Sequence, residues 1–260
     1  MPRPARSDDF SGMLMPALLT VLTLWPVPVL AANTINLRWD DCIGDGGVAD
    51  KSFACDANTG AARLVGSWIP PFDLVGVNGN QIVVDLGTSS TSLPAWWDLK
   101  NTGSCRPLSL GFGAANPGAG VNCSDWASGT AVGLLGSYTV GIKGPGSARF
   151  VASTTVAEPV AETLVATQEY FSFVLTINHL KTVGAGSCTG CDVQMCIALI
   201  GVHVTSADPR FDVHLSIGFR PTDQLSDSFV LWQPAAGQTN CFKPVPVIDR
   251  TWGEVKALYR

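Results

Sequence analysis

The alternation of apolar and polar residues between positions 169 and 218 predicts three β-strands. In the first and third runs every second residue is apolar, as in a strand with one buried face. The apolar face is expected to comprise Phe171, Phe173, Leu175, Ile177, Phe211, Val213, Leu215 and Ile217. The opposite face, with Ser172 and Ser216, is expected to face solvent. The second run, residues 197–205, is apolar on both faces and is therefore predicted to be a central strand.

The second and third runs are predicted to form an antiparallel hairpin, because Asp208 and Pro209 between them are typical turn residues. If the apolar faces match, the numbers of paired residues have an odd sum, and the register with a sum of 417 places His203 directly opposite His214. Two adjacent imidazoles are candidate metal ligands. The alternative is a polar cross-strand pair on a sheet surface, since the sequence shows no third ligand.

Shorter patterned runs predict further strands at residues 34–39, 63–69, 81–86, 132–143, 148–156 and 228–233. Gly144-Pro145-Gly146 indicates a hairpin between two of them, and residues 104–129 are expected to form a long disulfide-pinned loop. The predicted fold is all-β, a single antiparallel β-sandwich, jelly-roll-like, of about ten strands. Thr251 and Glu254 form a capping box that predicts a short C-terminal helix.

The N-terminus has the layout of a secretory signal peptide. Arg3 and Arg6 precede an apolar run at residues 13–30, and Ala31 and Ala32 suit a cleavage site. We therefore expect residues 1–32 to be removed and 33–260 to form one domain, secreted to the cell surface or the extracellular space with no membrane span. The alternative is a retained membrane anchor, but prolines interrupt the apolar run.

The charge balance argues against nucleic acid or an anionic membrane as a partner. The chain has a net charge of −5, and no Lys/Arg cluster interrupts it. Charged residues make up only 14% of the chain, while glycine and proline are abundant. This composition is typical of a turn-rich extracellular β-protein.

Eight cysteines follow the signal segment, and an even number in an exported chain predicts four disulfides. Proximity in sequence favours Cys42–Cys55 and Cys105–Cys123. The last four cysteines are ambiguous, and Cys191–Cys196 with Cys188–Cys241 is the favoured pairing. The alternative for these four is a zinc site, because Cys188 and Cys191 have the spacing of a zinc half-site.

Two further features suggest ligands. Asp40, Asp41 and Asp45 lie in a loop dense in carboxylates, which are the ligands that calcium needs, although the spacing does not match an EF-hand. Adjacent Trp96 and Trp97 must point to opposite faces if they lie on a strand. One of them is then exposed and is a candidate platform for a sugar ring.

No catalytic residues are assigned, because the chain contains none of the familiar hydrolase or phosphate-binding motifs. Paired carboxylates for glycoside cleavage remain an alternative. The acidic residues considered for it are Asp40, Asp85, Asp98 and Glu169.

Several segments carry a resemblance to a family. They are 38–42, 53–55, 93–97, 181–184 and 250–260. In these segments the chain resembles a group of uncharacterised bacterial proteins that carry signal peptides, over nearly the whole mature length. The resemblance implies no activity and no residue role. We therefore expect a secreted, non-catalytic β-sandwich that is a structural or ligand-binding module, with a glycan or a cell-surface component as its partner. The alternatives are a carbohydrate-binding module and a secreted polysaccharide-active hydrolase.

Overall fold

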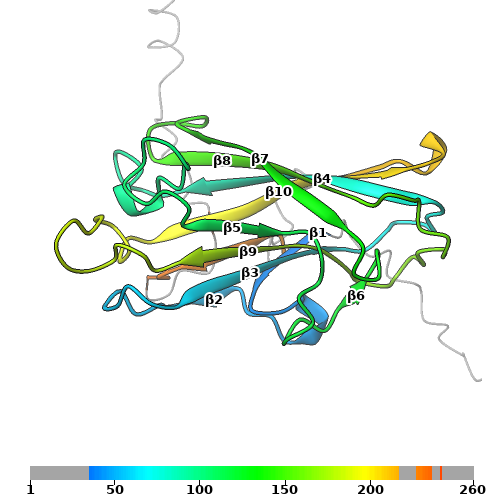
Figure 1. Cartoon of the computed structure of the whole chain (residues 1–260), viewed down its shortest axis with the longest axis horizontal. Helices are drawn as coiled ribbons and strands as arrows, with labels where there is room; N and C mark the ends of the chain where they lie inside the picture. The colour runs from blue at the N-terminus through cyan, green and yellow to red at the C-terminus, as the bar shows by residue number, and fades with distance from the viewer. Residues whose placement is uncertain (1–34, 217–226, 236–240, 242–260) are drawn as a thin grey trace, which may run out of the picture. The chain divides into compact units, whose positions relative to one another are not determined.

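The computed structural model describes residues 35–216, 227–235 and 241, which form two β-sheets packed face to face (Figure 1). The five-stranded sheet has the order β1 (Ile35–Trp39), β3 (Ala61–Trp68), β9 (Tyr170–Asn178) and β5 (Leu110–Gly113), with β6 (Ser124–Asp125) also beside β9. The seven-stranded sheet has the order β2 (Asp50–Lys51), β12 (Phe229–Trp232), β10 (Met195–Ser206), β4 (Val77–Gly87), β8 (Ser147–Thr155) and β7 (Val132–Val140), with β11 (Val213–Ser216) also beside β10. Three short 3-10 helices are η1 (Ile43–Asp45), η2 (Ala95–Trp97) and η3 (Pro209–Phe211).

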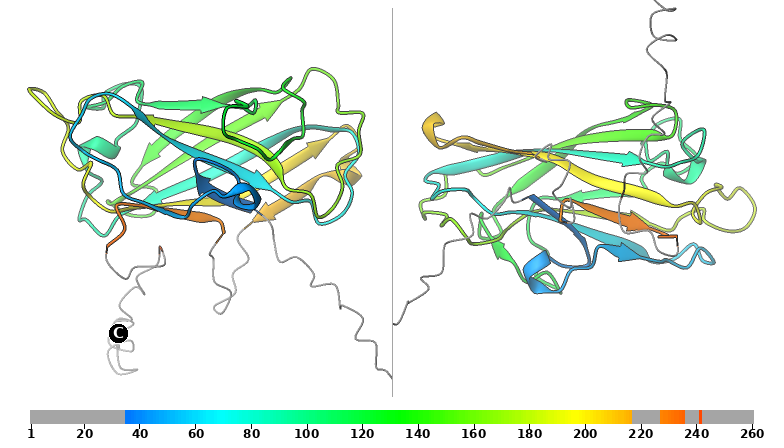
Figure 2. Two further views of the ribbon diagram at one scale, coloured as in Figure 1. Left: turned by 90° about the horizontal axis from the view of Figure 1, so that it is seen from below. Right: turned by 180° about the vertical axis from the view of Figure 1, so that it is seen from behind.

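The all-β prediction is confirmed, as are the main strands and the antiparallel hairpin of β10 and β11. In that hairpin His203 lies opposite His214, which is the register with a sum of 417. Strand β10 is central, with β4 on one side and β12 and β11 on the other. Figure 2 shows β10, β12 and β2 side by side in the view from behind. The sheets are not purely antiparallel, because the two-residue strands β2 and β6 pair in parallel with β12 and β9.

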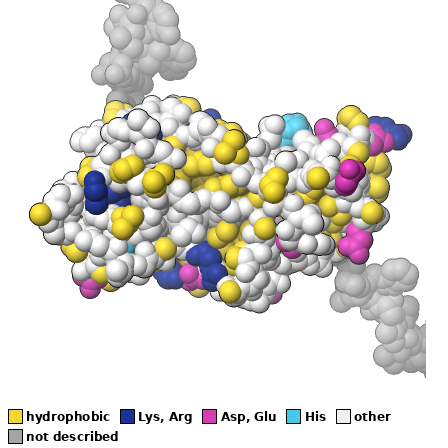
Figure 3. All heavy atoms as spheres, in the orientation of Figure 1, with side chains coloured by type: hydrophobic (Ala, Val, Ile, Leu, Met, Phe, Trp, Pro, Cys, Tyr) yellow, Lys and Arg dark blue, Asp and Glu magenta, His cyan; other side chains and the backbone are white. Residues whose placement is uncertain are grey.

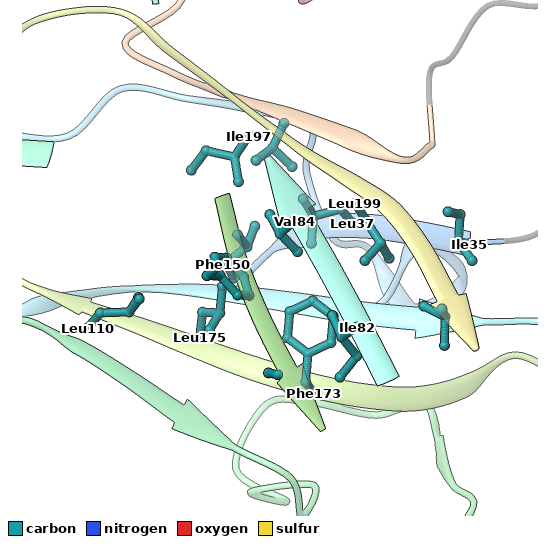
Figure 4. Close-up of a cluster of buried hydrophobic side chains, with 14 of the residues drawn as sticks. Ile35, Leu37, Ile82, Val84, Leu110, Phe150, Phe173, Leu175, Ile197 and Leu199 are labelled. Carbon is teal, nitrogen blue, oxygen red and sulfur yellow. The ribbon is translucent and has the colours of Figure 1, made fainter. Parts of the chain in front are cut away.

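The core lies between the two sheets (Figure 4). Phe173 and Leu175 of β9 face Ile82 and Val84 of β4, and all four are at most 1% exposed. These residues alternate along their strands as a period of two requires, so each sheet presents one continuous apolar face. The predicted inward positions Phe173, Leu175 and Ile177 are therefore confirmed.

The beginning of β9 does not follow the predicted faces. Gly66 of β3 pairs with Phe173 of β9, but the next residue, Ser67, pairs with Phe171. Ser172 is therefore an extra residue in β9, without a partner of its own in β3. Such a bulge reverses the faces on one side of it. Ser172 points inward and its hydroxyl donates to Oδ1 of Asn80 at 3.3 Å, whereas Phe171 joins a separate buried cluster. The expectation that Phe171 faces the core and Ser172 faces solvent is therefore wrong.

A second difference concerns residues 95–97 and 104–129. Pro94 precedes η2, so Trp96 and Trp97 lie on a 3-10 turn and not on a strand. Residues 104–129 are not one loop, because β5 and β6 form within them and pair with β9. Glycine at two of the four positions of β5 hides its apolar alternation.

Four disulfides are present and no described cysteine is free, but all four predicted pairings are wrong. The pairs are Cys42–Cys123, Cys55–Cys191, Cys105–Cys188 and Cys196–Cys241. Sequence proximity failed because the sandwich brings distant loops together, with separations of 45 to 136 residues. The zinc alternative is also wrong, since Cys188, Cys191 and Cys196 bond to three different partners.

Three expectations fall outside the described residues: the signal peptide at 1–32, the helix at 251–260 and the position of Ile217. Among the described residues, no helix has the length and hydropathy needed to cross a membrane.

Candidate functional site

An open groove of about 520 Å³ lies on the outer face of the seven-stranded sheet. Ala198 of β10 and Gly87 of β4 are small residues on its floor, beside the fully buried Leu231 of β12. Because side chains alternate along a strand, Ala198 points away from the core to which its neighbours Ile197 and Leu199 belong. Small floor residues leave the space that larger side chains would fill.

Two backbone segments form one wall of the groove. The loop at 88–90 packs against the turn at 143–147 that joins β7 and β8. The amide of Thr88 donates to the carbonyl of Gly146 at 3.0 Å, and a Cβ on Gly146 would lie only 2.7 Å from the carbonyl oxygen of Ser90. The close contact therefore requires glycine at position 146.

One carboxylate in the groove lining, that of Asp85, is paired with two cations. Asp85 accepts hydrogen bonds from Nε of Arg149 at 2.6 Å and from Nη2 at 2.9 Å, and Nζ of Lys143 lies 2.6 Å from Oδ2. Burial acts to raise the pKa of Asp85, but the hydrogen bonds from Arg149 and Lys143 outweigh it and lower that pKa. Asp85 is therefore ionised at neutral pH, and Lys143, with a half-exposed side chain, leaves a cation at the groove rim.

The groove is also rich in hydroxyl and amide groups. Thr88, Ser89 and Ser90 line it from one strand end, and Gln194 lines it from the start of β10. Such groups exchange hydrogen bonds with a polar ligand without a net charge. The sequence interpretation missed these residues, although the run Thr-Ser-Ser-Thr-Ser at 88–92 was a visible signal.

Trp96 and Trp97 do not form an exposed platform, and this prediction is wrong. Both side chains are fully buried and pack against Trp232, with ring centroids 5.1 Å and 5.2 Å away. Nε1 of Trp96 donates to the hydroxyl of Thr182 at 3.0 Å. The two tryptophans are thus structural residues at one end of the sandwich.

Arg106, which the sequence did not single out, lies over this aromatic cluster. Its guanidinium carbon is 3.5 Å from the ring centroid of Trp96, and the residue is 1% exposed. It donates to the carbonyls of Trp96 at 2.6 Å and Leu180 at 2.8 Å, and also to that of Asn178. Burial lowers the pKa of Arg106 to about 10, so the side chain remains charged. It joins the loop after η2 to the end of β9 and is structural.

The calcium candidates are held by other groups. Asp40 forms an ion pair with Lys51, and Asp41 accepts from the amide of Cys42 at 2.8 Å and from Nδ2 of Asn122 at 2.6 Å. Burial, and then the charges of Asp41 and Glu169, raise the pKa of Asp45. Within residues 35–216, 227–235 and 241, no group of three or more His, Cys, Asp or Glu side chains is arranged to hold a metal ion.

His203 and His214 are brought together as predicted, but as a stacked pair. Their ring centroids are 3.6 Å apart and the rings are nearly parallel, at 12°. Oδ2 of Asp212 lies 3.9 Å from Nε2 of His203. Burial, and then the nearby His214, lower the pKa of His203, whereas Asp212 acts to raise it.

The four carboxylates considered for glycoside cleavage have separate partners. Asp85 pairs with Arg149, Asp98 with Lys100 at 3.2 Å, and Asp40 with Lys51. Glu169 accepts from Nδ2 of Asn36 at 3.1 Å, from the amide of Gly44 at 2.9 Å and from the hydroxyl of Ser67. None of these contacts joins one of the four acids to another.

Comparisons with family models, with curated proteins and with solved structures found no match for this chain.

Proposed function

We propose that the protein is a secreted, non-catalytic β-sandwich of the bacterial cell surface or extracellular space, where it is a ligand-binding or structural module. The jelly-roll-like arrangement of the sheets and the helix at 251–260 belong to the same proposal. No metal ion or organic cofactor is needed for it.

The observation that carries the proposal is the set of four disulfides. They fix both ends of the sandwich, since Cys42–Cys123 lies beside the start of β9 whereas Cys55–Cys191 and Cys105–Cys188 surround the loop that follows it. Structural disulfides form in oxidising compartments and outside the cell. Cys42–Cys123 and Cys105–Cys188 close loops of 81 and 83 residues. By restricting the unfolded chain, each of these disulfides stabilises the fold by about 4 to 5 kcal/mol.

The groove beside Asp85 is the ligand site that we assign to this module. Its hydroxyl and amide lining, with the cation of Lys143 at the rim, suits a glycan or another polar component of the cell surface. Glycan binding is thus proposed through the hydrogen-bonding groups of this groove and not through an aromatic platform, since Trp96 and Trp97 are buried. The separate partners of the four carboxylates give the hydrolase alternative no support.

A glycan array with parallel hydrolysis assays tests the proposal on the mature, disulfide-bonded protein. We expect selective glycan binding without release of product. Ser90→Trp, at the groove mouth, should abolish binding because the indole fills the site. Ser187→Trp, on an exposed loop that does not line the groove, is the matched control and should bind as the wild type does. Release of product would overturn the non-catalytic assignment, and equal binding by both variants would overturn the groove.

A further inference from the structure

Strand β7 is the outermost strand of the seven-stranded sheet, with β8 as its one neighbour in that sheet. In the part of the chain that the structure describes, no hydrogen bond joins the outer edge of β7 to another segment. The hydroxyl of Tyr138 does donate to the carbonyl of Trp97 at 2.5 Å, but this contact lies on the inner side of the strand. The edge therefore presents unpaired backbone donors and acceptors.

The other described edges are shorter or covered. Strand β2 has two residues, and β5 and β11 have four each. All five residues of β1 are buried. Strand β7 has nine residues, so it is the long accessible edge of the described fold. Natural proteins usually protect such an edge with charged residues, with proline or by covering it.

The outer face of β7 is apolar and uncharged. A Cβ on Gly133 would lie 2.6 Å from Cε1 of Phe112 in β5 of the facing sheet, so position 133 points inward. Positions 132 and 134 consequently point outward, and Val132 and Leu134 are 64% and 69% exposed. Residues 131–142 contain no charged side chain and no proline. Figure 3 shows hydrophobic side chains gathered on this side of the molecule, over the region of β7 in Figure 1.

We infer that β7 pairs with β7 of a second copy of this chain, in an antiparallel, two-fold symmetric arrangement. The uncharged edge fits a partner strand that is itself uncharged, exposed and apolar on one face. Among the described strands β7 has these properties, so a second copy supplies the match without bringing like charges together.

The bulge in β7 determines where the two copies pair. The register shift between Leu135 and Ser137 divides the strand into two regular parts, 132–135 and 137–140, and the first part carries the exposed Val132 and Leu134. A two-fold axis at Gly133 then places Val132 of each copy opposite Leu134 of the other, on the same face of a continuous sheet. Because the short segment limits the buried area, the dimer is expected to be reversible. The inference does not rest on the groove, whose wall is the turn at 143–147, after the end of β7 that is opposite to Val132 and Leu134.

Sedimentation equilibrium of the mature protein over a range of concentrations tests the inference. The wild type should show a monomer–dimer equilibrium. Its dissociation constant should not rise with salt concentration, because no ion pair holds the two copies together. Leu134→Lys should raise the dissociation constant by roughly tenfold or more, since a charge would replace the apolar cross-strand contact. Val165→Lys introduces the same charge at a 48% exposed valine outside the strands and should leave the constant unchanged.

Hydrogen exchange locates the contact. Amides of residues 131–135 should become more protected as the wild-type concentration rises, and those of Leu134→Lys should not. A wild-type protein that stays monomeric at millimolar concentration would overturn the inference. So would a dimer that Leu134→Lys leaves intact, because the contact would then lie elsewhere.

Discussion

Arg106→Ala tests how much one buried cation contributes to this fold. The substitution removes the donor of three carbonyls, of which that of Trp96 is fully buried and cannot gain water in exchange. A buried acceptor left without its partner costs about 1 to 3 kcal/mol, and the lost cation–π contact with Trp96 adds about 1 to 2 kcal/mol. The two part-buried carbonyls can be hydrated and add less. We therefore expect the substitution to lower the free energy of unfolding by about 4 kcal/mol.

The assay is urea unfolding of the oxidised protein, followed by circular dichroism and tryptophan fluorescence. The midpoint should fall while the slope m stays constant, as expected when stability alone changes. Arg63→Ala is the matched control, because Arg63 also donates to two carbonyls, those of Ala119 and Gly120, but in an exposed region. It should lower stability by about 0.5 kcal/mol or less. If Arg106→Ala lowers stability no more than Arg63→Ala does, the assignment of Arg106 as a structural residue is refuted.

Three further predictions concern the disulfides, the bulge and the histidines. Thiol titration of the denatured, non-reduced protein should find no reactive cysteine, and peptide mapping should find Cys42 bonded to Cys123; a Cys42–Cys55 peptide would contradict the fold. Ser172→Asp should destabilise by roughly 3 kcal/mol or more because it buries a charge, whereas Ser216→Asp on the exposed side of β11 should change stability by about 0.5 kcal/mol or less. If Ser172→Asp and Ser216→Asp changed stability equally, Ser172 would not point into the core and the bulge would be excluded. Burial lowers the pKa of His179 and of His203 below 6.5, so the unfolded chain binds more protons and stability should decrease as pH falls below about 6.5. A urea midpoint that is unchanged between about pH 7.5 and pH 5 would contradict this.

The strands were predictable where the sequence alternates over a long run. The pattern at 197–205 and 211–217 narrowed the register, because a slip by one residue would turn one apolar face outward; the register that places His203 opposite His214 is one of those it allows, and it is the one the structure has. The bulge at Ser172 was not predictable, since Phe171 on the other face is also apolar and buried, and the alternation in the sequence therefore continues through the bulge. Likewise, nothing local distinguishes Trp96 and Trp97 on a turn from a strand pair except the preceding Pro94.

The disulfides and the groove depend on contacts between distant segments. Cys55 lies 13 positions from Cys42 in sequence, yet bonds to Cys191, which is 136 positions away. The groove combines β4, β10 and β12 with the turn at 143–147, so its residues share no common motif. Only the hydroxyl run at 88–92 and the isolated Asp85 in an apolar strand were visible beforehand.

The disulfide connectivity has a consequence for how the chain must mature. If the chain is exported from its N-terminus, Cys42, Cys55, Cys105 and Cys123 emerge first, and only one native pair, Cys42–Cys123, can form among them. The neighbouring thiols of Cys42 and Cys55 meet much sooner, so early oxidation favours a wrong bond. Correct pairing then requires thiolate attack on that bond after Cys188 and Cys191 have arrived. For an exported chain we therefore expect a host with a disulfide isomerase as well as an oxidase to give the native pairs, and a host without the isomerase to accumulate isomers with scrambled disulfides.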